Sequence, residues 1–130
     1  MIKKFLESDL LAQFLVNRSA LSLAQVDTLF IFITHRSQGE PLSAMVKSRD
    51  GKVVTRGAFV RTLDQSQKNV IKSVYTLILA HYMGLVDLGR LHSLVRICEM
   101  LTGIRGIPVS EERWKELTAI IEEVCRSFSG

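Results

Sequence analysis

The segment from residue 53 to residue 86, VVTRGAFVRTLDQSQKNVIKSVYTLILAHYMGLV, restricts the fold of this chain more than any other stretch. Thr55 is suited to cap a helix here. Residues 56–83 form either one long helix or two that separate near Asp64, where Asp64 and Gln67 offer a second capping pair. Apolar residues recur at three- and four-residue steps, the period of an amphipathic helix, at Phe59, Val60, Leu63, Val70, Val74, Leu77, Ile78 and Tyr82.

The segments before this one also carry helix signals. Residues 2–17 space their apolar side chains in the manner of an amphipathic helix. A second helix is predicted over about 23–36, because Ser22 and Gln25 have the spacing of a capping box. Pro41 suits the first position of a further short helix, where its missing N–H is not needed.

The remaining turn and helix signals complete the fold class. The Asp50-Gly51 pair is a strong hairpin signal, so residues 45–54 form either one short β-hairpin or a loop. After Gly84 another helical pattern runs to Gly103, and a last helix is predicted to start with Ser110 as its N-cap. The sequence therefore predicts a mainly α fold of five to six helices with at most one short β-hairpin.

Length and composition limit the organisation of the chain. At 130 residues and 47% hydrophobic content, we expect one domain over residues 1–130. The longest apolar run without Asp, Glu, Lys or Arg, residues 73–86, is shorter than the roughly 18–20 residues of a membrane span. The first residues resemble a signal peptide only in their two lysines, since Glu7 and Asp9 interrupt the apolar region. We therefore expect a cytoplasmic protein that does not insert into a membrane.

The sequence offers little for catalysis. Its three histidines, His35, His81 and His92, lack metal-site spacing and are expected at the surface or its boundary. Cys98 and Cys125 lie among aliphatic residues and are expected to be reduced core residues; the alternative is a disulfide between their two helices. The glycines are scattered singly and form no phosphate-binding loop. We expect no enzyme activity, no metal, no cofactor and no small-molecule ligand.

Positive charge is concentrated in one part of the chain. Residues 47–72 carry seven basic and two acidic residues, an excess larger than the net charge of +4 for the whole chain. A helix over 61–76 would gather polar and basic side chains on one face, and such side chains contact phosphates and base edges in duplex DNA. The apolar side of that helix would pack on the body of the domain. The expected DNA contacts are Arg49, Lys52, Arg56, Arg61, Gln65, Lys68, Asn69, Lys72, Ser73 and Thr76.

Within this set, two roles are distinguished. Gln65, Lys68, Asn69, Lys72 and Ser73 are expected to contact the groove. The four arginines and lysines at 49, 52, 56 and 61 are expected to contact phosphates, which fix register without reading sequence. Few aromatic residues lie nearby, which favours duplex DNA over single strands or RNA.

The stretch QKNVIKSVYTLILAHYMGLV resembles the recognition helix and exit turn of small archaeal and bacterial helix-turn-helix regulators, including winged-helix ones. The likeness covers residues 22–86. It implies a helix-turn-helix core and a role as a DNA-binding transcriptional regulator. Two features depart from the winged-helix pattern: a helix follows Gly84 where a wing would stand, and the predicted ribbon at 45–54 precedes the recognition helix.

The terminal segments, residues 1–18 and 87–130, are expected to flank this core and to form a homodimer. The last helix carries an apolar seam of four- and three-residue steps made of Trp114, Leu117, Ile121, Val124 and Phe128. The alternative is that the helix at 2–17 covers this seam within one chain. The alternative function is a helical interaction module, whose basic face binds an acidic protein or an anionic membrane surface.

Overall fold

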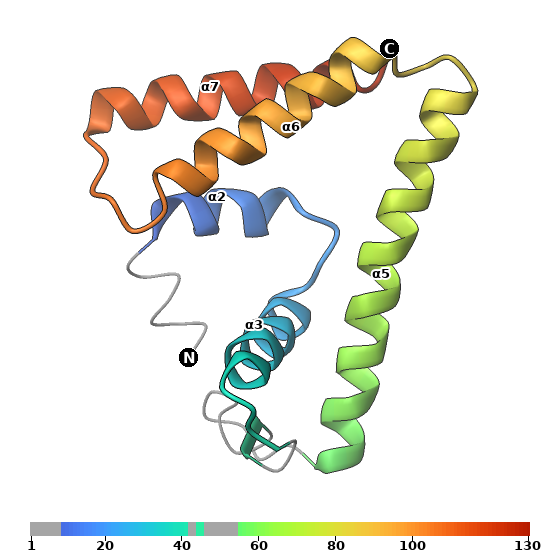
Figure 1. Ribbon diagram of the computed structural model, residues 1–130, viewed down its shortest axis with the longest axis vertical. Coiled ribbons are helices and arrows are strands. Elements are labelled where there is room, and N and C mark those ends of the chain that lie inside the picture. The colour runs from blue at the N-terminus through green and yellow to red at the C-terminus, as the bar shows by residue number, and fades with distance from the viewer. Residues whose placement is uncertain (1–8, 42–43, 46–54) are drawn as a thin grey trace. The chain divides into compact units, whose positions relative to one another are not determined.

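A computed structural model describes residues 9–41, 44–45 and 55–130 of the chain (Figure 1). No strand occurs among these residues, and the predicted mainly α fold is confirmed. The first eight residues, and nearly all of the segment expected as a hairpin, lie outside the described part. The helices are α2 (Leu10–Arg18), α3 (Leu23–Ser37), α5 (Arg56–Tyr82), α6 (Leu88–Gly103) and α7 (Glu111–Ser127).

The chain gathers into two compact units, Met1–Ser73 and Val74–Gly130, and their boundary falls inside α5. The single domain expected from the sequence stays a prediction. The first unit contains α2, α3 and the beginning of α5. The second contains the end of α5 together with α6 and α7.

Local capping explains where α3 begins. The Ser22 hydroxyl accepts a hydrogen bond from the Gln25 amide at 3.2 Å, and the Gln25 side chain accepts one from the Ser22 amide at 3.0 Å. The predicted capping box is therefore confirmed. The preceding helix, expected over 2–17, is described from Leu10 onward, where the Asp9 carboxylate caps it by accepting from the Ala12 amide at 3.1 Å.

The long segment is one helix of 27 residues, which settles the alternatives that the sequence left open. The Thr55 hydroxyl caps it by accepting from the Ala58 amide at 3.0 Å. Asp64 does not interrupt the helix, and its carboxylate contacts the ammonium of Lys68 at 2.8 Å. The chain leaves the helix at Gly84, whose φ of 86° is a left-handed conformation that glycine adopts without steric cost.

The core of the first unit lies between α3 and the start of α5. Ile31 of α3, Phe59 of α5 and Met45 are buried together, and Phe32 and Leu63 pack against them. The beginning of α5 is thus fixed to α3 by apolar contacts, which decides which of its faces remain open to solvent.

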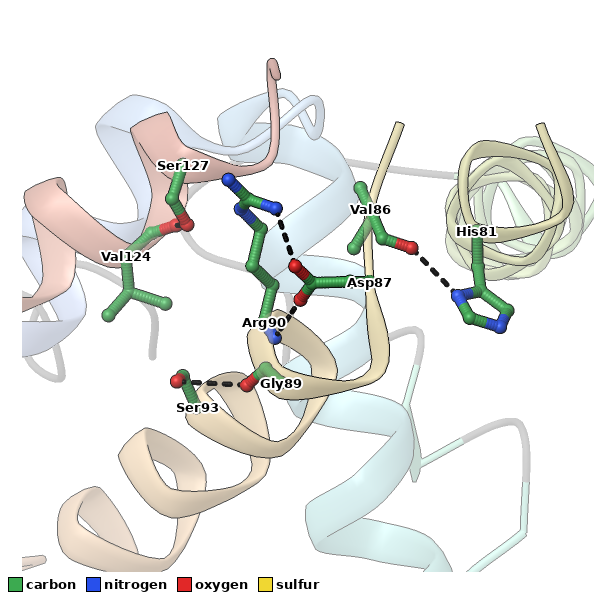
Figure 2. A network of polar contacts seen from close by, with 8 residues as sticks. All are labelled: His81, Val86, Asp87, Gly89, Arg90, Ser93, Val124 and Ser127. Atoms are coloured by element: carbon green, nitrogen blue, oxygen red, sulfur yellow. Dashed lines mark hydrogen bonds and ion pairs between the residues drawn. The ribbon is translucent and has the colours of Figure 1, made fainter. Parts of the chain in front are cut away.

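In the second unit, α6 and α7 pack side by side (Figure 1). Ile97 of α6 and Leu117 and Ile121 of α7 are buried. Figure 2 shows how α6 begins: the Asp87 carboxylate accepts from the Arg90 amide at 2.8 Å and contacts its guanidinium at 2.9 Å. A ring nitrogen of His81 lies 2.7 Å from the Val86 carbonyl oxygen in the same turn.

In this unit one expectation of the sequence is corrected and another is confirmed. Cys98 and Cys125 are both free and exposed, because each lies on the outer side of its helix although its neighbours in sequence are aliphatic. The segment that follows Gly84 is helical, as its pattern predicted, so α6 stands where a winged helix would have its hairpin.

Candidate nucleic-acid interface

One face of α5 presents four long polar side chains to solvent. Arg61, Gln65, Lys68 and Lys72 are all exposed. They follow one another by four, three and four residues, which places them within about 60° of arc on the helix. We call these four residues the cationic face. Three of the four carry positive charge, and together they occupy three turns of a rigid scaffold.

The side of α5 toward α3 is held by polar contacts as well as by Phe59. The hydroxyl of Ser66 is buried; it donates to the Thr62 carbonyl of its own helix at 2.6 Å and lies 3.5 Å from the Gln25 carbonyl oxygen of α3. The Asn69 side-chain amide donates to the Gln25 side-chain oxygen on α3 at 3.4 Å. Gln25 therefore both caps α3 and contacts α5, a role that its place in the capping box did not reveal.

Asn69 consequently differs from the other residues expected to contact a groove. Its side chain is half-buried and directed at α3, whereas Gln65 and Lys68 face solvent. Ser73 is exposed, but its hydroxyl donates to the Asn69 carbonyl at 2.9 Å. Thr76 is also exposed.

Of the four residues expected to contact phosphates, Arg56 and Arg61 lie on different sides of α5. Arg61 belongs to the cationic face. Arg56 is exposed in the first turn of α5, about 140° around the helix from Arg61. Arg49 and Lys52 lie outside the described residues.

One acidic residue lies within the span of the cationic face. Asp64 is the one acidic residue between 61 and 72, and it pairs with Lys68 at 2.8 Å with both side chains more than half exposed. A pair of this kind is screened by solvent and is worth only a few tenths of a kcal/mol. Lys68 can therefore leave Asp64 for a phosphate at little cost.

The apolar side of α5 is not packed as the sequence predicted. Val70, Val74 and Ile78 were expected to pack on the body of the domain, yet all three are 45–59% exposed. The reason is that Phe59, Leu63 and Ser66, through which α3 meets α5, all lie near the beginning of the helix, whereas Val70, Val74 and Ile78 lie one to three turns farther along it. Leu77 is half-buried.

The seam expected to hold a homodimer is largely covered within the chain. Leu117 and Ile121 of α7 are buried, at 0% and 4% exposure. Trp114, Val124 and Phe128 are half-buried. Much of this seam is therefore used inside the second unit, where α7 packs on α6.

His35 lies at the end of α3 in a setting that the sequence did not indicate. It was expected at the surface or its boundary, but it is buried, and its Nδ1 contacts the Glu40 carboxylate. The five-residue separation of the two was the available signal, since a turn after a helix can bring such residues together. This contact joins the end of α3 to the following turn and contributes nothing to the exposed face of α5.

Other kinds of site are not found in the described residues. No group of three or more His, Cys, Asp and Glu side chains there is arranged to hold a metal ion. Within the same part of the chain, no helix combines the length and apolar character needed to cross a membrane. Comparisons of the chain with protein-family models, with curated proteins and with solved structures found no match.

Proposed function

We propose that this chain binds duplex DNA without catalysis, as a small helix-turn-helix-type regulator that uses α5 as its recognition helix. The observation that carries the proposal is the cationic face: Arg61, Gln65, Lys68 and Lys72 are exposed together on one long, continuous helix. Its residue types suit the task, because arginine and lysine bind phosphates and guanine and glutamine binds adenine.

The dimensions of α5 support the same function. The cationic face extends over twelve positions, or roughly 16 Å along the helix axis at a rise of 1.5 Å per residue. The major groove of B-DNA is wide enough to admit an α-helix. The contact between α3 and α5 through Phe59 and Ser66 turns this face away from α3. The winged-helix resemblance contributes less, because α6 follows the recognition helix.

The test is the salt dependence of binding to a random duplex, measured by fluorescence anisotropy. The affinity should fall linearly on a log–log plot, with a slope of about −0.9 for each phosphate neutralised. Lys72→Ala should weaken binding to every duplex and reduce the slope by about one. Lys115→Ala, which removes an exposed lysine of α7, is the matched control and should change neither value.

A wild-type chain with no duplex affinity at low salt would contradict the proposal. The alternative, a module that binds an acidic protein, is separated by repeating the titration with polyglutamate. A DNA-binding protein should prefer the duplex at equal charge concentration, and Gln65→Ala should alter its ranking of different sequences by about 1–3 kcal/mol. Polyglutamate binding of equal strength with no ranking of duplexes would favour the alternative.

A further inference from the structure

A second face of α5 is apolar and open. Ile71, Val74, Tyr75, Ile78 and Tyr82 recur at helical spacing and lie within about 100° of arc. We call them the apolar stripe. Each is more than half exposed, and Tyr82 is 87% exposed. A stripe of this width is the one that a helix in a folded protein normally turns toward a core.

We infer that the apolar stripe is the surface on which two copies of this chain pair, with the two α5 helices antiparallel. The accessible area is sufficient. Five side chains of this size and exposure present on the order of 700 Å² of surface per copy, and each partner in a stable interface of standard size buries about 800 Å².

Charge also favours a second copy as the occupant. Residues 73–86 contain no Asp, Glu, Lys or Arg, so two stripes meet without an unpaired charge between them. Paired parallel, each Lys68 and Lys72 would lie beside its own counterpart, which is unfavourable. Paired antiparallel about the middle of the stripe, the two Lys68 residues lie roughly 26 Å apart along the axis, well beyond the screening length of about 8–10 Å.

The antiparallel arrangement also places the two cationic faces on the same side of the pair, and the use of this arrangement for DNA binding rests on the proposed function. The two-fold axis of an antiparallel pair is perpendicular to both helices, so a face to one side of the stripe is repeated on the same side of the pair. The two cationic faces then point the same way, with centres roughly 30 Å apart along the helices. Half-sites one turn of DNA apart are separated by about 34–36 Å.

The experiment is the mass of the chain in solution without DNA, measured by size-exclusion chromatography with light scattering at tens of micromolar. We expect twice the 14.6-kDa chain mass. Ile78→Glu, which places a carboxylate at the middle of the stripe, should return the mass to that of one chain. Val95→Glu alters an exposed apolar residue of α6 and should leave the dimer intact.

The direction of pairing is tested by disulfide formation in a Cys98→Ala, Cys125→Ala background. This experiment also tests the dimer if Ile78→Glu fails to fold. Ile78→Cys should cross-link to itself, because the two positions are roughly 5 Å apart along the axis, whereas Ile71→Cys should not, at roughly 17 Å. The reverse result would overturn the antiparallel arrangement. A monomeric wild type would overturn the dimer itself, whether or not it co-sediments with vesicles of phosphatidylglycerol and phosphatidylcholine. Neither result depends on DNA binding.

Discussion

Two helices of this protein carry apolar residues in nearly the same spacing, but only one of them is covered. The seam of α7 buries Leu117 and Ile121 inside the second unit, whereas on α5 Tyr75 and Ile78 are 68% and 59% exposed. The difference is in the neighbours: α7 has α6 alongside, and the contacts of α5 with the α3 core lie near the beginning of α5, before the stripe. Apolar residues at helical spacing thus do not by themselves show that the same chain covers them.

The largest expected effect tests this contrast directly. Leu117→Ala should lower the free energy of unfolding by about 2–5 kcal/mol, because it leaves a cavity among packed side chains, and the loss should be independent of protein concentration. Ile78→Ala should lower stability only at concentrations where the chain is dimeric. Urea denaturation at two concentrations, one hundredfold apart, measures both. Equal, concentration-independent losses would mean that the two seams are covered in the same way.

A smaller effect on stability is expected at the turn between α5 and α6. Asp87→Ala removes the N-cap of α6 and its contact with Arg90, and should cost about 1 kcal/mol. Asp87→Asn keeps a capping oxygen and should cost much less, since an exposed ion pair contributes little. Thermal melts followed by circular dichroism compare the two variants. If both lose the same amount, the ion pair matters more than the cap.

The smallest effect is expected at Asp64, beside the cationic face of α5. Asp64→Asn removes the i,i+4 ion pair with Lys68 and should change stability by only about 0.3–0.5 kcal/mol. It should at the same time strengthen duplex DNA binding, because it removes the acid from beside the cationic face. Stability and DNA affinity measured at the same salt concentration test both effects. Weaker DNA binding by this variant would show that Asp64 positions Lys68 productively.

Much of the fold was available from the sequence because it depends on near neighbours. Ser22 with Gln25, Thr55 and Ser110 are the predicted caps, and each accepts the expected backbone hydrogen bond. Helical spacing identified the later helices to within a few residues. It left the continuity of α5 open, because Asp64 fits a cap and a helix interior equally well. In the structure its carboxylate meets Lys68 on the next turn.

The sequence by itself determined the helices, their caps and the concentration of positive charge on α5, because these follow from residues within one or two turns of each other. Only the tertiary structure decided which side of each helix is covered. Asn69 contacts Gln25, 44 residues earlier in the chain, and Cys98 and Cys125 are exposed. The physical reason is that a helix fixes which side chains share a face, while burial depends on what packs against that face from elsewhere.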